Sequence, residues 1–113
     1  MSDENIAAVE KYLEALRTKD LSLAPFADGL RFSDSIAGEG VGAEKLRAFL
    51  SGFLPGITSV RVLKHVSQGE YVATHWEVDG VFGIISILEL FRVNDGMITE
   101  SIANYDPGAV LGT

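Results

Sequence analysis

The first half of the chain carries apolar residues at helical spacing. A helix is expected from residue 2 or 3 to about residue 17, because one face carries Ile6, Val9, Leu13 and Leu16. A short helix or turn is expected over 20–26, then an alternating strand over 30–34 and a loop over 37–40. The third predicted helix covers 43–54, ends at Pro55-Gly56, and places on one face Leu46, Phe49, Leu50 and Phe53.

The second half changes to the alternating pattern of strands. Successive antiparallel strands are predicted over 57–66, 71–78, 81–93 and 97–105. The turns between them are expected at Gln68-Gly69, Asp79-Gly80 and Asn94-Asp95-Gly96. A loose tail is expected from Asp106-Pro107-Gly108. Helices followed by a run of strands favour a single α+β domain over residues 1–113, rather than an alternating α/β domain.

The strand predicted over 81–93 is apolar on both of its faces. One face must pack on the helices. The other face carries Ile84, Leu88 and Leu90, and no remaining part of the chain is expected to cover it. We therefore predict a homodimer that forms through the outer face of the sheet.

Composition narrows the classes of function. The chain has 113 residues, which fits one domain, and it contains no cysteine, which excludes disulfides, thiolate metal sites and a cysteine nucleophile. The net charge of −7 and the scattered Lys and Arg residues argue against nucleic-acid binding. The two histidines, ten residues apart, make a poor metal cluster. A cytoplasmic protein that does not enter a membrane is expected, because the acidic N-terminus lacks signal-peptide character and the apolar runs are short.

Three stretches resemble one known superfamily. They are Lys11–Leu16 with Lys19–Leu21, then Phe26–Asp34, then Glu89–Ile98. With the order of elements, they make residues 4–107 similar to the nuclear transport factor 2-like superfamily, which includes SnoaL-like proteins and ketosteroid isomerases. The resemblance implies a cystatin-like fold, a cone-shaped barrel of a highly curved antiparallel sheet wrapped around three N-terminal helices, with an apolar pocket between them. The superfamily includes isomerases, cyclases, epoxide hydrolases and binding proteins without catalysis.

The ketosteroid isomerase branch gives the best match of motifs. Its oxyanion hole uses a tyrosine of the first helix and an aspartic acid of a late strand, and an aspartate at the end of the first strand moves the proton. By position, the resemblance assigns the tyrosine to Tyr12 and the base to Asp34. It assigns the second oxyanion donor to Glu89, where the isomerases carry aspartic acid. Ser35 stands where those enzymes carry proline.

The residues themselves allow this chemistry and leave alternatives. Asp34 shares strand parity with Phe32, so it either faces an apolar pocket as a general base or opens a turn as an Asx residue. Glu89 is the only ionisable group of an apolar stretch. It is therefore a protonated donor in the pocket, an acceptor for the Tyr12 hydroxyl, or an outward residue paired with a Lys or Arg. Tyr12 lies at the edge of the first helix's apolar face, so it is a pocket donor or a rim aromatic.

Strand parity also gives a set of candidate ligand contacts. Inward-facing positions that would line the pocket, or else simply pack the core, are Phe32, Val72, Thr74, Trp76, Ile87, Phe91, Ala103 and Tyr105. His75 has the opposite parity to Trp76 and is expected on the outer face. His65 is expected at the surface or on an edge strand.

These observations favour an enzyme acting on a small hydrophobic carbonyl compound. Asp34 would take a proton beside the carbonyl, and Tyr12, with protonated Glu89, would stabilise the enolate in an isomerisation or an aldol-type cyclisation that needs no metal or organic cofactor. The alternative is a ligand-binding or dimerisation module without catalysis. Glutamate in place of aspartate moves the carboxyl group by about one methylene, and catalysis depends on the exact position of such a group. An epoxide hydrolase is the weakest hypothesis, because that branch pairs two aspartates through an arginine and Arg31 and Arg92 have the wrong parity.

Overall fold

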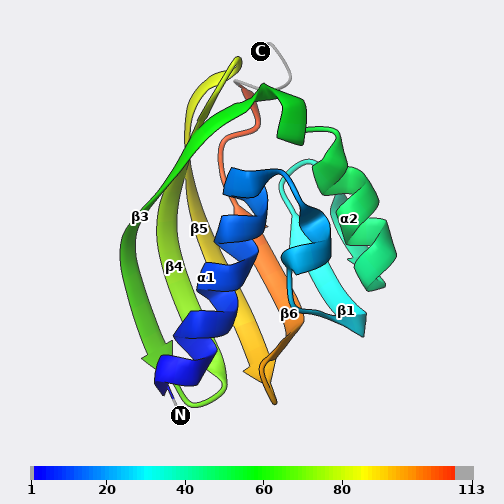
Figure 1. The fold of residues 1–113 in the computed structure, drawn as a ribbon, viewed down its shortest axis with the longest axis vertical. Helices are drawn as coiled ribbons and strands as arrows, with labels where there is room; N and C mark the ends of the chain where they lie inside the picture. Colours follow the sequence, from blue (N-terminus) through cyan, green and yellow to red (C-terminus); the bar gives the residue numbers. More distant parts are fainter. Residues whose placement is uncertain (1, 109–113) are drawn as a thin grey trace.

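Two α-helices, two short 3₁₀ helices and a six-stranded sheet make up the part of the chain that the structure describes (Figure 1). The structure is a computed structural model, and it describes residues 2–108. The elements, in chain order, are α1 (Ser2–Thr18), η1 (Leu21–Leu23), β1 (Phe26–Asp34), β2 (Gly38–Val41), α2 (Ala43–Ser51), η2 (Leu54–Gly56), β3 (Ile57–Gln68), β4 (Tyr71–Gly80), β5 (Gly83–Asn94) and β6 (Met97–Asn104). Two parts of the predicted domain 1–113 lie outside the described residues: residue 1, and residues 109–113 at the end of the expected tail.

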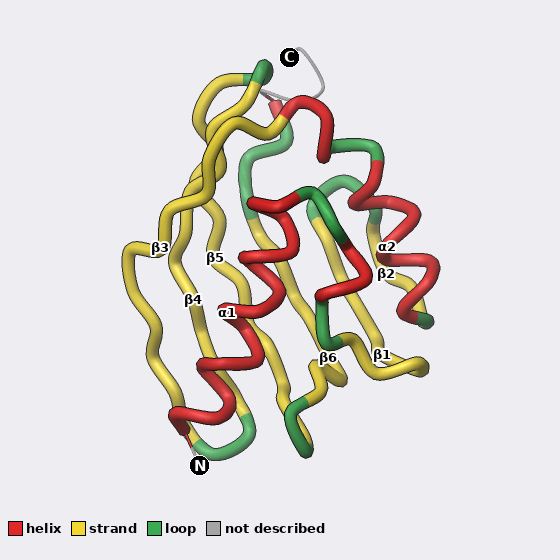
Figure 2. The backbone as a smooth tube through the Cα atoms, viewed as in Figure 1, coloured by secondary structure: helices red, strands yellow, loops and turns green. Residues whose placement is uncertain are grey.

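The sheet has the strand order β2-β1-β6-β5-β4-β3 and curves around α1 (Figures 1 and 2). The long strands β3 to β6 form an antiparallel meander, as the sequence predicts. The strand β1 pairs with β6 in parallel, which adds one parallel ladder to a sheet expected to be antiparallel. The predicted α+β class with a highly curved sheet is confirmed. The curvature matters for function, because it leaves room between the sheet and the helices.

Helix α1 lies in the hollow of the sheet and supplies much of the core. Val9, Leu13 and Leu16 of the predicted apolar face are at most 2% exposed, while Ile6 is only partly buried. The Tyr12 ring packs among other rings of the core, with centroid distances of 5.4 Å to Phe26 and 5.7 Å to Phe91. Full burial of such side chains stabilises the fold by about 1.5–3 kcal/mol each.

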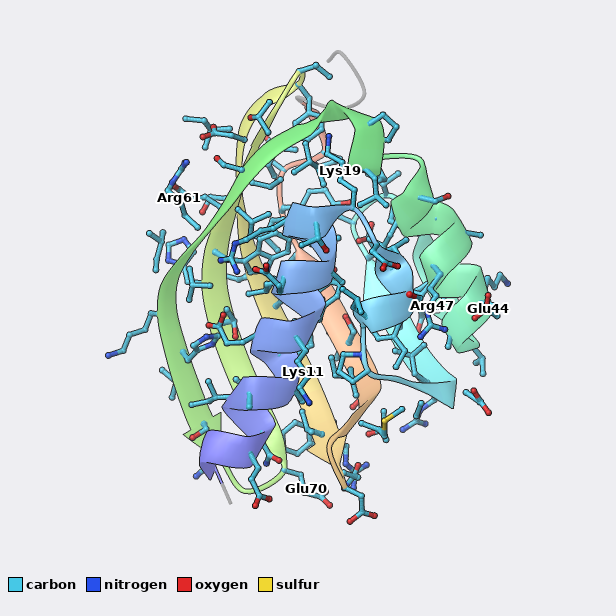
Figure 3. All side chains as sticks on the ribbon, in the orientation of Figure 1. Lys11, Lys19, Glu44, Arg47, Arg61 and Glu70 are labelled. Carbon is cyan, nitrogen blue, oxygen red and sulfur yellow. The ribbon has the colours of Figure 1, made fainter. Side chains whose placement is uncertain are left out.

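Strand β5 shows why the sheet has two different faces. Its inward positions are buried, and they are Ile85, Ile87, Glu89, Phe91 and Val93. Its outward positions include Ile84 and Leu88, each 63% exposed, and Leu90, 37% exposed. Of the charged side chains labelled in Figure 3, Arg47 is half-buried and the others are exposed.

Several boundaries differ from the sequence prediction, and each difference has a local cause. Residues 38–41 form β2 rather than a loop, because the Asp34 carboxylate accepts hydrogen bonds from the Ile36 and Ala37 amides and turns the chain back on β1. The first strand begins at Phe26, where the expected short helix still continued. Helix α2 ends at Ser51, since the chain tightens into η2 around Pro55. The turn expected at Asp79-Gly80 falls on residues 81–82, because Gly80 still pairs with Gly83.

No helix within residues 2–108 combines the length and the apolar character that crossing a membrane requires.

Candidate functional site

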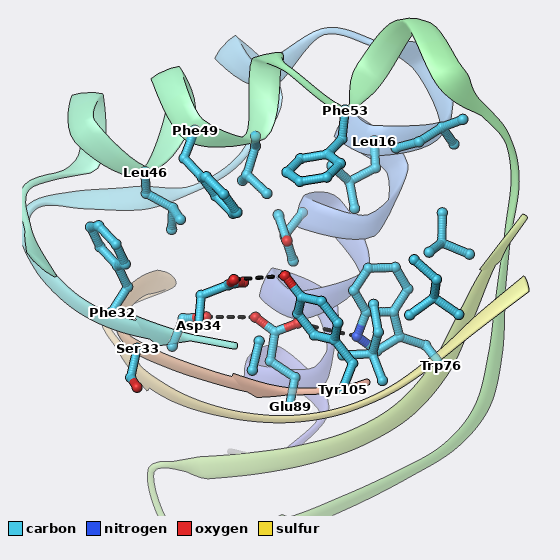
Figure 4. Close-up of a pocket in the computed structure, with 18 of the residues that line it drawn as sticks. Leu16, Phe32, Ser33, Asp34, Leu46, Phe49, Phe53, Trp76, Glu89 and Tyr105 are labelled. Atoms are coloured by element: carbon cyan, nitrogen blue, oxygen red, sulfur yellow. Dashed lines mark hydrogen bonds between the residues drawn. The ribbon is translucent and has the colours of Figure 1, made fainter. Parts of the chain in front are cut away.

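A cavity of about 70 Å³ lies between the concave face of the sheet, α1 and α2 (Figure 4). Side chains from α2 and the turn after it close one side, and side chains from the sheet close the other. Among the lining residues are most of those predicted from the sequence: Tyr12, Phe32, Asp34, Trp76, Ile87, Glu89, Ala103 and Tyr105. The volume is about half of the roughly 150 Å³ that accommodates benzene. A ring-sized ligand therefore requires the lining side chains to move apart.

Asp34 lies at the end of β1, and one of its two carboxyl oxygens accepts three hydrogen bonds. Its Oδ1 accepts hydrogen bonds from the Ile36 amide at 2.8 Å, the Ala37 amide at 3.1 Å and the Tyr105 hydroxyl at 2.7 Å. Asp34 is thus an Asx-type turn residue that also lines the cavity, and its role as a general base stays a prediction. Within residues 2–108 its Oδ2 has no hydrogen-bond partner, which leaves that oxygen available to a ligand.

Tyr105 and Ser35 fix the place where β1 and β6 end beside each other. The Ser35 hydroxyl accepts a hydrogen bond from the Tyr105 amide at 3.0 Å, while the Tyr105 hydroxyl donates to Asp34 (Figure 4). Burial, and then the hydrogen bond to Asp34, raise the pKa of the Tyr105 hydroxyl well above its usual value. Tyr105 therefore keeps its proton and holds Asp34 in one orientation. Ser35, which replaces the proline of the isomerases, contributes to the same junction.

Glu89 is buried, with only 5% of its surface exposed, and points into the hollow from β5. Its Oε1 accepts a hydrogen bond from the Trp76 indole at 3.1 Å, and its Oε2 lies 2.5 Å from the Ser101 hydroxyl. Its partners are thus neither the Tyr12 hydroxyl nor a Lys or Arg. Burial raises the pKa of Glu89 from 4.5 to about 7, and the bonds to Ser101 and Trp76 oppose this rise only in part.

The Tyr12 hydroxyl has no hydrogen-bond partner within the described residues, although the side chain is only 4% exposed. No fully enclosed side-chain nitrogen or oxygen in this part of the chain lacks a partner, so the hydroxyl oxygen opens onto the cavity. Burial, and then the charges of Glu89 and Asp34, raise the pKa of Tyr12 well above its usual value. Tyr12 therefore keeps its proton, and it lines the same cavity as both carboxyl groups.

The sequence analysis missed part of the aromatic wall. Phe49 and Phe53, from α2 and the turn after it, point into the cavity (Figure 4), and Phe82 from the β4–β5 turn joins them. The rings of Phe49 and Phe53 meet at a centroid distance of 5.1 Å. Their shared helix face with Leu46 was visible in the sequence, but only the packing of α2 over the sheet turns that face toward a cavity.

Three predicted ligand contacts do not line the cavity. Val72, Thr74 and Phe91 are at most 1% exposed and belong to the solid core nearer the start of α1. Strand parity correctly predicted that these side chains face the inside of the sheet. It cannot predict how far along the strand each one lies from the cavity. Thr74 also has a partner of its own, because its hydroxyl lies 2.8 Å from His65 Nδ1.

The two histidines lie away from the cavity. His65 is on the edge strand β3, as expected, where its Nε2 lies 2.6 Å from a Glu10 carboxyl oxygen. His75 Nε2 lies 2.8 Å from the hydroxyl of Ser86, on the outer side of β4 and β5. Within residues 2–108, no three of the His, Asp and Glu side chains gather closely enough to hold a metal ion.

The sequence and the fold both have known relatives. The model of the SnoaL-like domain family matches residues 9–101, a span that includes Tyr12, Asp34 and Glu89. The chain belongs to the SnoaL-like domain family. No curated protein matches this SnoaL-like chain in sequence.

Solved structures with the same fold carry several different descriptions. A putative SnoaL-like polyketide cyclase from Jannaschia sp. CCS1 is 18% identical, with a TM-score of 0.81 over 97% of this chain and 90% of its own. An LEH-like epoxide hydrolase from M. tuberculosis is 21% identical, with a TM-score of 0.78 over 98% of this chain and 89% of its own. A putative ketosteroid isomerase from Kribbella flavida is 16% identical, with a TM-score of 0.80 over 93% and 79%. At these identities the likeness establishes the SnoaL-like fold, not the reaction.

Proposed function

We propose that this SnoaL-like chain is a cofactor-independent enzyme that moves a proton next to the carbonyl group of a small hydrophobic compound. The observation that carries the proposal is that one apolar cavity holds a carboxyl oxygen, Asp34 Oδ2, and a phenol, Tyr12, neither of which has a hydrogen-bond partner among residues 2–108. Asp34 takes the proton beside the carbonyl. The electrons of the broken C–H bond form an enolate, and Asp34 returns the proton to another carbon of the substrate.

The other side chains of the cavity support these two roles. The Tyr12 hydroxyl donates a hydrogen bond to the enolate oxygen. In an apolar cavity a hydrogen bond to a negative oxygen is stronger than in water. Tyr105 and the Ile36 and Ala37 amides fix the base, which keeps Oδ2 as its reacting oxygen. Glu89, protonated in a large fraction of molecules near neutral pH, keeps a second negative charge out of the cavity.

The test is turnover of a single-ring β,γ-unsaturated ketone, followed by the absorbance of its conjugated product. Asp34→Asn keeps the size and the turn hydrogen bonds of residue 34 but removes the base, so we expect the rate to fall by about 10²- to 10⁴-fold. The matched control is Asp28→Asn, an exposed position on the same strand, which should leave the rate unchanged. Equal rates for the wild type and Asp34→Asn would remove Asp34 as the base.

A binding protein without catalysis is the second candidate. It is favoured by one observation, that both Glu89 oxygens already have partners in Trp76 and Ser101, so this acid offers no free donor to a ligand. The same assay separates the two functions. A wild-type chain that binds the ketone, detected through the fluorescence of Trp76, but never converts it is a binding protein.

The epoxide hydrolase arrangement is not supported. Arg31 is largely exposed and lies 3.9 Å from Glu100, and Arg92 pairs with Glu70 at 2.8 Å. Neither arginine lines the cavity, so within the described residues no arginine can link two carboxylates around a water there.

We also propose that two copies of the chain pair through the outer face of the sheet. This face exposes Ile84 and Leu88 on β5 and Val66 on β3, each by more than half of its surface. Uncovered apolar area of this kind on a sheet is typical of a protein–protein contact. A second copy presents the same residues, so the contact would be symmetric.

A further inference from the structure

Among the described residues, the lining of the cavity combines many aromatic rings with carboxyl groups and includes no cationic side chain. The rings are those of Tyr12, Phe32, Phe49, Phe53, Trp76, Phe82 and Tyr105. Within the described residues, no Lys, Arg or His side chain lines the cavity. The faces of aromatic rings carry partial negative charge, so a wall of this kind attracts a positive group and not a negative one.

Asp34 has no counter-ion within residues 2–108. It takes part in none of the salt bridges of the described residues, which join other acids to Arg or His side chains. Its Oδ1 accepts three donors, while Oδ2 has no partner in the described part of the chain, and Asp34 lines the cavity (Figure 4). An ionised carboxyl group only accepts hydrogen bonds, so the group missing from the site is a donor.

The Tyr12 hydroxyl is a second group of the same cavity without a hydrogen-bond partner in the described part of the chain. It is more than nine-tenths buried, has no partner within the described residues and opens onto the cavity. A buried tyrosine hydroxyl ordinarily has a polar partner. Its oxygen can accept a hydrogen bond, and both Tyr12 and Asp34 line the same cavity, so within the described residues the cavity offers two acceptors and no positive charge.

We propose that this cavity binds a small hydrophobic amine in its ammonium form. The ammonium group donates hydrogen bonds to Asp34 Oδ2 and to the Tyr12 oxygen, and its charge is balanced by Asp34. The alkyl or ring portion lies against Phe49 and Phe53, which are half-buried and are the part of the wall that can move aside. The inference uses the cavity of the proposed function, but it does not require that Asp34 moves a proton.

Charge is the property that selects the ligand. A neutral alcohol of the same shape makes the same apolar contacts but lacks the charge-assisted hydrogen bond and the cation–π attraction. A carboxylate of that shape meets two acids and no cation. The cavity should therefore rank ligands of one shape in the order ammonium, alcohol, carboxylate.

The experiment compares cyclohexylamine, cyclohexanol and cyclohexanecarboxylate as probes of one ring size. Trp76 is the only tryptophan of the chain and lines the cavity, so its fluorescence reports binding directly. We expect the amine to bind at least about tenfold more tightly than the alcohol, the difference that one charge-assisted hydrogen bond typically makes. Equal affinities for the amine and the alcohol, or tighter binding of the carboxylate, would overturn the inference.

Two variants distinguish binding at this cavity from general attraction of the amine to the chain, whose net charge is −7. Asp34→Asn should abolish the preference for the amine and keep the binding of cyclohexanol. Asp28→Asn removes the same charge from an exposed position of β1 and should keep the preference. If both variants reduce it equally, attraction to the whole surface explains the result and the inference fails. Should Asp34→Asn not fold, the ranking of the three probes on the wild type decides alone.

Ketone turnover measured on the same samples keeps the two proposals apart. A preference for the amine without turnover refutes only proton transfer. Turnover without that preference refutes only the amine site.

Discussion

The buried acid Glu89 gives the sharpest test of the electrostatics of the cavity. Glu89→Gln removes the ionisable group and keeps its shape. The amide oxygen of glutamine can accept from the Trp76 indole, and its NH₂ group can donate to the Ser101 oxygen, so both contacts of Glu89 survive the change. Any difference between the two proteins therefore reports the charge of Glu89.

The magnitude follows from the pKa of Glu89, which burial raises from 4.5 to about 7. Between these values the folded chain holds a proton that the unfolded chain has released, so the folded state loses stability as the pH rises. The contribution is fully present below pH 4.5 and is lost as the pH rises through about 7. At 1.36 kcal/mol for each pKa unit, the total is about 3 kcal/mol, most of it between about pH 5 and pH 8.

Urea unfolding at pH 5 and pH 8, followed by Trp76 fluorescence, measures this effect. At pH 5 the wild type and Glu89→Gln should have nearly equal free energies of unfolding. At pH 8 the variant should be the more stable by about 2–3 kcal/mol, because only the wild type must bury a charge. Glu39→Gln, an exposed acid on β2, is the control and should follow the wild type at both pH values.

One result would refute the reasoning. If the difference in stability between Glu89→Gln and the wild type is the same at pH 5 and pH 8, Glu89 is ionised in the folded chain throughout that range. The hydrogen bonds from Trp76 and Ser101 would then outweigh its desolvation, and the cavity would carry two negative charges near neutral pH.

Three further outcomes are expected. Tyr12→Phe should change the free energy of unfolding by less than about 1 kcal/mol, since the lost hydroxyl has no hydrogen-bond partner among residues 2–108, yet it should lower ketone turnover; unchanged turnover would exclude Tyr12 as the donor. Phe91→Ala should destabilise the chain by about 3–5 kcal/mol in urea unfolding, because the ring is 0% exposed and packs on Tyr12; a smaller loss would mean that the core closes around the gap. Leu88→Lys should shift sedimentation from dimer to monomer with the fold intact by circular dichroism, whereas Lys11→Glu on the exposed face of α1 should not; a wild-type monomer contradicts the proposed contact.

Local patterns fixed most of the secondary structure. The period of the apolar residues distinguishes α1 from the strands of the meander, and the Asn94-Asp95-Gly96 turn falls where expected, with positive φ at Asp95 and Gly96. The prediction of secondary structure failed where pairing between distant segments decides whether a segment becomes a strand. Residues 38–41 become β2 only because β1 is available beside them, and β1 in turn lies parallel to β6, almost seventy residues further along the chain.

For the candidate site too, local patterns predicted one property of the residues and tertiary packing decided another. Parity indicates that Asp34, Trp76 and Glu89 face inward, because side chains alternate along a strand whatever surrounds it. Parity does not tell which inward residues reach an open space, and Val72 and Phe91 prove to be solid core. The depth of each residue depends on where α1 and α2 cover the curved sheet.

The sequence by itself determined the helices, the meander and the inward direction of the acids, since each depends on neighbours a few positions away in the chain. Only the tertiary structure decided which of these residues meet. The hydrogen bond between Tyr105 and Asp34 and those from Trp76 and Ser101 to Glu89 join elements far apart in the chain, and the same packing places the Tyr12 side chain at the cavity. The chemistry of the cavity depends on those contacts, because burial and hydrogen bonding, not residue type, set which group holds a proton.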